Sequence, residues 1–301
     1  MVSGVDYAAY YSGRTLGKLE KPFKGQDKVF ASFRLDGQDI LDADFTHCTF
    51  GGISFKRVTV QNAGFLNCVF IDCYFRRTEL RNTRFTGCRF IDCRFPYVVV
   101  KSCDFRHSSF QGCQLAYSEM VHSLPSEPNL REEIARNLAL ESAALGLYSE
   151  SRKYRMAEIR AREEHLLSAF LGRSQWYRDH FDFTNRVKTF IEWLLSKLNG
   201  LLWGYGEKWW VLMRNLLLVS LLLFPLLFYV FRNDIAHGSN GAVGVPQLFY
   251  FSLENIVPTG IQSEVIAVGG TARFLAGLES FLGIVAIALF ASYIFRWSLR
   301  R

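Results

Sequence analysis

The stretch NCVFIDCYFRRTEL, residues 67–80, places Cys68 and Cys73 five residues apart, each two residues before a phenylalanine. This spacing continues far beyond the stretch itself. All seven cysteines of the 301-residue chain lie at positions that leave a remainder of three on division by five. The positions divisible by five, from Ile40 to Met120, hold seventeen consecutive apolar residues. A fixed internal period is interpreted before any local motif, so this period decides how the first half of the chain folds.

A period of five matches neither the 3.6-residue repeat of a helix nor the two-residue repeat of a strand. It suits a chain that turns a corner every five residues and points one central side chain inward on each side. Residue type also repeats every twenty residues, because positions 45, 65, 85 and 105, and positions 50, 70, 90 and 110, are all phenylalanine. Four sides per coil therefore predict a square rod about 20 Å long, at a strand spacing of roughly 4.8 Å.

Residues 40–120 resemble the pentapeptide-repeat family, with every repeat present in register. The resemblance implies a right-handed quadrilateral β-helix, which we assign to residues 28–124. The N-terminal segment 1–27 has no continuous apolar stretch, so we do not expect a cleaved signal peptide.

The cysteines admit three interpretations: metal ligands, disulfide partners or core residues. Zinc ligands converge on one point, whereas these thiols are spread along the rod, one per side. Stacked neighbours such as Cys68 and Cys88 are close enough for a disulfide, but a cytosolic location would keep them reduced. We expect buried free thiols that act as small hydrophobes, and neither a metal nor a cofactor.

The middle of the chain changes character. Residues 125–175 are rich in Ala, Leu, Glu and Arg, which favour helices, and a break near Gly146 predicts a helical hairpin connector. The hairpin is similar to a TPR unit, so it packs on the rod, on a neighbouring subunit or on both, and a peptide-binding role is an alternative. Residues 176–210 mix aromatic and basic residues, which predicts a helix on the membrane surface, with a soluble partner helix as the alternative.

Two long apolar runs predict transmembrane helices at residues 211–231 and 274–295. Pro225 is expected to kink the first. Lysine and arginine residues precede the first run and follow the second. This pattern predicts that both termini are cytosolic, in a plasma (inner) membrane. The rod would then be cytosolic too, in agreement with reduced thiols.

The segment 246–264 between these runs contains a short apolar stretch that breaks at Pro258 and Gly260. Such backbone is tolerated at membrane depth only inside protein or beside a water-filled cavity, so it predicts a re-entrant pore loop. Two helices per chain cannot enclose a cavity, and several subunits must therefore surround it.

The run LFYFSLENIVPTGIQSE resembles the pore helix and filter of two-transmembrane, pore-loop channels of the potassium-channel type, over residues 208–301. The resemblance implies pore-helix and pore-support roles for Glu254, Asn255 and Glu279, and makes Gly283 a candidate gating hinge. It also implies a filter made of Val257, Pro258, Thr259, Gly260, Ile261 and Gln262. The potassium filter has the pattern T-V-G-Y-G, from which this run departs, so potassium selectivity is not expected.

The net charge of +7 permits a nucleic-acid or an anionic-lipid partner, but a basic excess is also usual on the cytosolic side of membrane proteins. Residues 40–120 carry ten Lys or Arg against seven Asp or Glu, which argues against mimicry of DNA. No phosphate-binding loop or histidine cluster occurs, so we do not expect an enzyme.

We therefore interpret the chain as multidomain: a β-helix, an α-helical connector and a two-helix transmembrane pore domain. The function that this organisation favours is an oligomeric, tetrameric cation channel with a non-standard filter, whose cytosolic β-helix serves assembly or sensing. Its expected partners are permeating ions, the lipid bilayer, further copies of the chain and a cytosolic ligand or protein, without nucleic acid. The alternative is a membrane-anchored scaffold that does not conduct.

Overall fold

The computed structural model describes residues 15–16, 21, 23–237, 243–256 and 265–299. The chain divides into two compact units, Met1–Phe190 and Ile191–Arg301. Each unit is described by itself.

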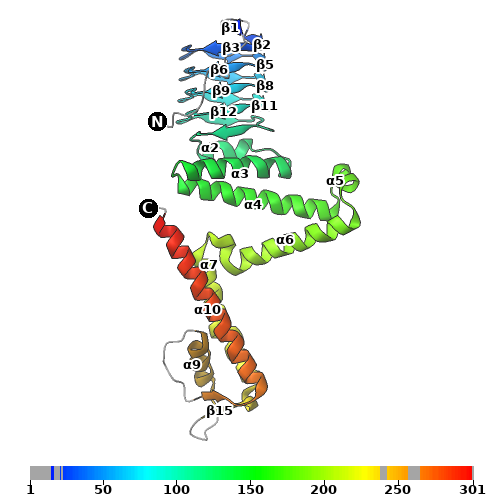
Figure 1. The fold of residues 1–301 in the computed structure, drawn as a ribbon, viewed down its shortest axis with the longest axis vertical. Helices are drawn as coiled ribbons and strands as arrows, with labels where there is room; N and C mark the ends of the chain where they lie inside the picture. Colours follow the sequence, from blue (N-terminus) through cyan, green and yellow to red (C-terminus); the bar gives the residue numbers. More distant parts are fainter. Residues whose placement is uncertain (1–14, 17–20, 22, 238–242, 257–264, 300–301) are drawn as a thin grey trace. The chain divides into compact units, whose positions relative to one another are not determined.

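The first unit begins with a four-sided β-solenoid of about four coils (Figure 1). Its parallel strands form three stacks, in the orders β1-β3-β6-β9-β12-β14, β2-β5-β8-β11 and β4-β7-β10-β13. The fourth side is made of isolated parallel bridges that join Arg34, Ser54, Tyr74, Arg94 and Gln114 in series. The strands are β1 Thr15–Leu16, β2 Lys24–Gln26, β3 Lys28–Ala31, β4 Asp39–Leu41, β5 Asp44–Thr46, β6 Thr49–Gly51, β7 Thr59–Gln61, β8 Gly64–Leu66, β9 Val69–Ile71, β10 Glu79–Arg81, β11 Arg84–Thr86, β12 Arg89–Ile91, β13 Val99–Lys101 and β14 Ser109–Gln111.

The register of the strands is the twenty-residue repeat predicted from the sequence. Phe50 pairs with Phe70, and Phe70 with Phe90. Their rings stack with centroids 4.8 and 4.9 Å apart and with interplanar angles of 10° or less. Adjacent sides meet edge to face, as aromatic rings prefer, so the phenylalanines fill the interior as columns.

The seven thiols are free and buried in this interior. Cys73 Sγ lies 3.3 Å from the carbonyl oxygen of Phe50, and Cys93 Sγ lies 3.4 Å from that of Phe70. Each of these thiols thus faces the backbone carbonyl oxygen of a phenylalanine in the preceding coil. Burial raises the pKa of Cys93 well above its ordinary value.

The corners of the solenoid share one backbone conformation. Every residue that lies two positions after a multiple of five, from Asp27 to Gly112, has a positive φ, between 49° and 75°. Aspartate, asparagine and glycine hold most of these positions, because they tolerate the left-handed region better than other residues. This corner pattern was not part of the sequence prediction.

The solenoid begins before residue 28, where the sequence analysis placed its start. Strand β2, Lys24–Gln26, pairs with β5 and belongs to the first coil. Its central residue is Gly25, and a Cβ there would lie 3.1 Å from the rings of both Phe30 and Phe45. Neighbouring rings therefore fill the place of a central side chain, which is why the apolar period did not reveal this side.

Helices close the other end of the solenoid (Figure 1). They are α2 Tyr117–Met120, the 3-10 turn η1 Val121–Ser123, α3 Pro128–Ala144 and α4 Tyr148–Leu171. The Asn137 side chain accepts a hydrogen bond from Phe110 N at 2.7 Å and donates one to Phe110 O at 3.0 Å. The Tyr154 hydroxyl is fully buried and donates to Leu115 O at 3.2 Å. The helical hairpin predicted for residues 125–175 thus packs on the rod and covers its last strand, which blocks edge pairing.

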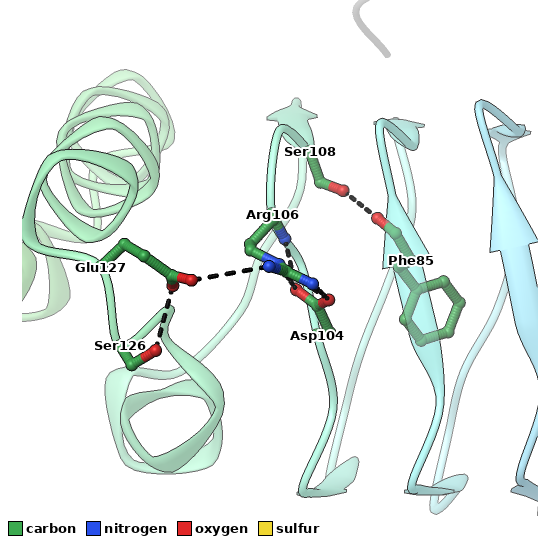
Figure 2. A network of polar contacts seen from close by, with 6 residues as sticks. All are labelled: Phe85, Asp104, Arg106, Ser108, Ser126 and Glu127. Atoms are coloured by element: carbon green, nitrogen blue, oxygen red, sulfur yellow. Dashed lines mark hydrogen bonds and ion pairs between the residues drawn. The ribbon is translucent and has the colours of Figure 1, made fainter. Parts of the chain in front are cut away.

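An ion-pair cluster ties the solenoid to the start of the hairpin (Figure 2). Arg106 Nη2 lies 2.8 Å from Asp104 Oδ2, and Arg106 Nη1 lies 3.5 Å from Glu127 Oε1. Ser126 Oγ donates to Glu127 at 3.0 Å. Burial acts to raise the pKa of Asp104, but the hydrogen bonds and charge of Arg106 outweigh it and hold this pKa below its ordinary value.

Residues 176–203 form two helices rather than one, α5 Gln175–His180 and α6 Phe183–Trp203. The side chains of α6 follow a helical period. Large apolar residues are exposed along it at Val187, Ile191, Leu194, Leu195, Leu198, Leu201 and Leu202. These positions lie on one stripe of the helix, a pattern that suits both the predicted membrane surface and the alternative of a partner helix.

The second unit contains two helices long and apolar enough to cross a membrane, Trp209–Val230 and Gly270–Phe295. Only 28% and 17% of their most apolar windows are buried within the chain, unlike the core helices of a soluble protein. The predicted spans, 211–231 and 274–295, lie close to these bounds, but the second helix begins earlier. The elements are η2 Gly204–Gly206, α7 Trp209–Leu218, the π-helical turn η3 Val219–Leu223, α8 Phe224–Val230, η4 Arg232–Asp234, β15 Ile235–His237, α9 Val245–Ile256, β16 Val265–Ala267 and α10 Gly270–Leu299.

The segment between the two long helices is closed at its base. Strands β15 and β16 pair antiparallel, with Ile235 opposite Ala267. Val268 N and Gly269 N both donate to Asp234 O at 2.9 Å. The chain therefore leaves the first helix and enters the second at one point, and α9 lies in the loop between them (Figure 1).

Candidate functional site

Helix α9 lies against both long helices of the second unit. Its apolar residues Leu248 and Phe251 are buried in a cluster with Phe224 and Phe228 of α8 and with Ala272 of α10. The rings of Phe228 and Phe251 meet edge to face, with centroids 4.9 Å apart. This contact fixes one face of the short helix against the first span.

A buried polar network forms at the centre of this packing. Ser252 of α9 and Glu279 of α10 have no exposed surface within the chain, and Ser220 of η3 is 2% exposed. Ser252 Oγ donates to Ser220 O at 2.7 Å and also contacts the Glu279 carboxyl group through Oε1. Asn255 Nδ2 lies 3.4 Å from Glu279 Oε2. Two side chains of α9, one side chain of α10 and one carbonyl of the first long helix are thus joined.

The Ser220 carbonyl is free to accept this bond because of a local change in helix type. Residues Val219–Leu223 form a π-helical turn, in which Phe224 N donates to Val219 O, five residues back. The next donor in that ladder would be residue 225, but Pro225 has no N–H. Ser220 O therefore loses its helical partner, and the Ser252 hydroxyl takes that place. The sequence analysis expected Pro225 to kink the helix, and the structure shows a π-helical turn directly before it.

Gly283 marks a close approach of α10 to the end of α9. A Cβ at Gly283 would lie 2.0 Å from the carbonyl oxygen of Ile256, the last residue of α9. Only glycine allows this distance, because any other residue carries a Cβ that would collide with the carbonyl oxygen. α10 runs as one helix, Gly270–Leu299, through this residue.

The structure places the other candidate residues as follows. Asn255 lies three residues from Ser252, on the same face of α9, and joins it at Glu279. Glu254 lies two residues from Ser252 on α9, and residues two apart do not share a helix face. The predicted filter residues Val257, Pro258, Thr259, Gly260, Ile261 and Gln262 lie outside the described residues.

Sequence reasoning missed Ser220 and its role. In an ordinary helix Pro225 would leave the carbonyl four residues before it, that of Leu221, without a donor. The free carbonyl of Ser220 instead follows from the π-helical turn, which the sequence pattern does not reveal. Within the described ranges, no group of three or more His, Cys, Asp or Glu is arranged to hold a metal ion. The network can hold α9 in a fixed position against the two long helices.

Comparison with known proteins concerns the solenoid. Residues 34–121 match the family described as pentapeptide repeat region. None of the curated protein sequences matches the chain significantly.

Among solved structures, the chain is similar to the pentapeptide repeat protein Rfr23 from the cyanobacterium Cyanothece 51142, at 8% identity and a TM-score of 0.24. That match covers 32% of this chain and 61% of Rfr23. The chain is also similar to HetL from Nostoc sp. strain PCC 7120, a protein involved in heterocyst differentiation regulation, at 16% identity and a TM-score of 0.17. This match covers 36% of this chain and 47% of HetL.

A third similar structure is trypsin-treated QnrB1, a plasmid-mediated fluoroquinolone resistance protein, at 14% identity and a TM-score of 0.17, over 31% of this chain and 56% of that one. The chain thus spans about half to three fifths of the length of these structures. The family match and the stacked, twenty-residue register together identify residues 34–121 as a pentapeptide-repeat domain.

Proposed function

We propose that the chain is one subunit of an oligomeric, tetrameric membrane ion channel, with the pentapeptide-repeat domain on the cytosolic side for assembly or sensing. One observation carries this proposal: a helix too short to cross a bilayer is fixed between two long apolar helices by buried polar groups. At 12 residues, α9 is about 18 Å long, against a hydrocarbon thickness of roughly 30 Å. A short helix in this place supports the interpretation as a pore helix.

The polar network strengthens the proposal, because polar groups in a membrane are costly and are retained where they act. A hairpin that only anchored a soluble domain would need neither the π-helical turn nor a buried carboxyl group. The Ser252 and Glu279 contacts instead hold the end of α9 where the filter sequence Val257–Gln262 begins.

The long helices also support an oligomer. Most of their apolar surface is exposed within one chain, including Leu222, Leu226, Phe274 and Phe281. Lipid and neighbouring subunits are the environments that suit such a surface. Because the filter sequence departs from T-V-G-Y-G, we expect a cation pore with its own selectivity rather than a potassium-selective one.

The test is ion flux through the purified protein in planar bilayers, under gradients of potassium, sodium and chloride in turn. We expect currents with a defined reversal potential that identifies the permeant ion. Ser252→Ala should reduce or alter these currents, because it leaves Ser220 O unpaired at a cost of about 1–3 kcal/mol.

Ser280→Ala is the matched control. Ser280 Oγ donates to Ala276 O of its own helix at 3.0 Å, so its loss leaves the α9 contacts unchanged. Folded oligomers that carry no current under any gradient would contradict the channel and favour the membrane-anchored scaffold.

A further inference from the structure

Basic side chains gather on one side of the solenoid. This side, which we call the basic face, consists of residues 34–37, 54–57, 74–77 and 94–97, around the bridges that replace strands. It carries six cations: Arg34, Lys56, Arg57, Arg76, Arg77 and Arg94. Its one carboxylate, Asp36, accepts a hydrogen bond from Ser54 Oγ at 2.5 Å. Of the charges between residues 40 and 120, five of the ten cations and none of the seven acids lie on this face.

The cations of the basic face have no carboxylate partner in the part of the chain that the structure describes. On another side, Arg81 pairs with Glu79 at 2.5 Å. Arg106 pairs with Asp104 at 2.8 Å (Figure 2). Asp72 and Asp92 lie at the corner that borders the face, and neither forms an ion pair with it. The positive charge of this face is therefore unbalanced within the solenoid.

One feature of the basic face opposes folding and so calls for a reason. Lys56 and Arg76, and likewise Arg57 and Arg77, are twenty residues apart in adjacent coils, where like charges repel. A surface with many negative charges would offset the repulsion.

The arrangement of side chains on the face indicates which kind of partner fits. Its bridging residues are in register from Arg34 to Gln114, so the cations stand in columns along one side of the solenoid. Tyr97, at the edge of this side, is 70% exposed. Anionic leaflets attract clusters of about four to eight Lys and Arg and accommodate tyrosine at the interface.

We propose that the basic face docks on the phosphate headgroups of an anionic lipid leaflet. This inference rests on the proposed membrane insertion, which keeps that leaflet within reach of the domain. Docking of this kind makes the position of the pentapeptide-repeat domain depend on lipid charge and on salt, because exposed charges are screened by ions.

The full chain, reconstituted in vesicles, allows a direct test. A fluorophore on Gln114→Cys reports the basic face, and one on Leu66→Cys reports the opposite side; the native thiols are buried and stay unlabelled. Quenching by nitroxide-labelled lipid is compared in phosphatidylcholine vesicles with and without phosphatidylglycerol. We expect the Gln114→Cys label to be quenched only with phosphatidylglycerol, and this quenching to be lost in high salt. The Leu66→Cys label should not be quenched in either.

Charge reversal identifies the residues. Arg76→Glu with Arg77→Glu should abolish the lipid-dependent quenching, and Arg34→Glu with Arg94→Glu provides a second, independent pair. The matched control, Arg84→Glu with Lys101→Glu, makes the same change of charge on other sides and should leave quenching unchanged. Thermal unfolding of each variant checks that the solenoid is intact.

Three results would overturn the proposal: no effect of phosphatidylglycerol, equal quenching in neutral vesicles, or loss of quenching in the control pair. Capture of duplex DNA that requires Arg76 and Arg77, without any lipid effect, would assign the face to nucleic acid instead. Resistance to alkaline carbonate extraction, measured on the same vesicles, reports insertion of the long helices. Failure of the proposed membrane function is thereby distinguished from failure of the docking.

Discussion

At the scale of single residues, the seven thiols show how burial removes chemical reactivity. Six of them are at most 1% exposed and Cys103 is 7% exposed, and burial raises the pKa of both Cys93 and Cys103. A raised pKa leaves little thiolate, which is the reactive form, at neutral pH. We expect aromatic disulfide reagents to modify none of the native thiols quickly, with Cys103 the first to react. Tyr97→Cys, at a 70% exposed position, is the control and should react at once; rapid modification of several native thiols would contradict the buried columns.

Gly283 tests the packing of α10 against α9 at the same scale. A Cβ there would lie 2.0 Å from Ile256 O, whereas a Cβ at Gly277, on the same helix, would meet nothing within 4 Å. Gly283→Ala should therefore separate the two helices and cost about 1–3 kcal/mol. Gly277→Ala should be neutral or stabilise the helix by roughly 0.5–1 kcal/mol. Thermal unfolding of the detergent-purified protein measures both, and equal effects would show that this close approach does not form.

At the scale of elements, the junction between solenoid and hairpin depends on acids with lowered pKa. Arg106 keeps the pKa of Asp104 below its ordinary value against the effect of burial, and the Glu127 backbone N–H and Ser126 do the same for Glu127. Such groups stabilise the fold above their unfolded pKa values, about 4, and this stability is lost as pH falls through the lower folded values.

We therefore expect the thermal stability of this junction to fall on acidification below about pH 4. In Asp104→Asn the fall should be shallower, because one of the titrating groups is absent. Asp42→Asn, an exposed acid in no described ion pair, is the control and should follow the parent. A parent and an Asp104→Asn variant with the same pH profile would show that this cluster does not stabilise the junction.

The elements also show what the sequence could predict. The solenoid followed from its period because each central side chain repeats the same packing, and Phe50, Phe70 and Phe90 lie as predicted. The sequence pattern did not reveal the first coil, because the central residue of its strand is Gly25 and neighbouring rings occupy the place of a side chain there. In the second unit, the resemblance to pore-loop channels named Glu279 and Asn255, but their joining to Ser220 through Ser252 depends on a π-helical turn. Such a turn depends on a single missing N–H, which no periodicity reveals.

At the scale of the whole molecule, the exposed apolar surface of the two long helices requires neighbours. With at most 28% of the most apolar window of either helix buried, one chain leaves most of this surface open. Lipid can cover this surface, but the proposed channel also needs a cavity beside α9, which only several copies can enclose. We expect the purified protein to contain four chains.

Mass measurement of the intact complex in detergent, together with copurification of two differently tagged copies, tests this number. Gly283→Ala supplies a variant in which α9 is displaced, and it should lower the fraction of full complexes, whereas Gly277→Ala should not. A purified monomer that keeps its fold would contradict the oligomer, since two helices and a half-length helix alone cannot surround a path for ions. In that case the same apolar surface would face lipid only, and the chain would act as a tether for its pentapeptide-repeat domain.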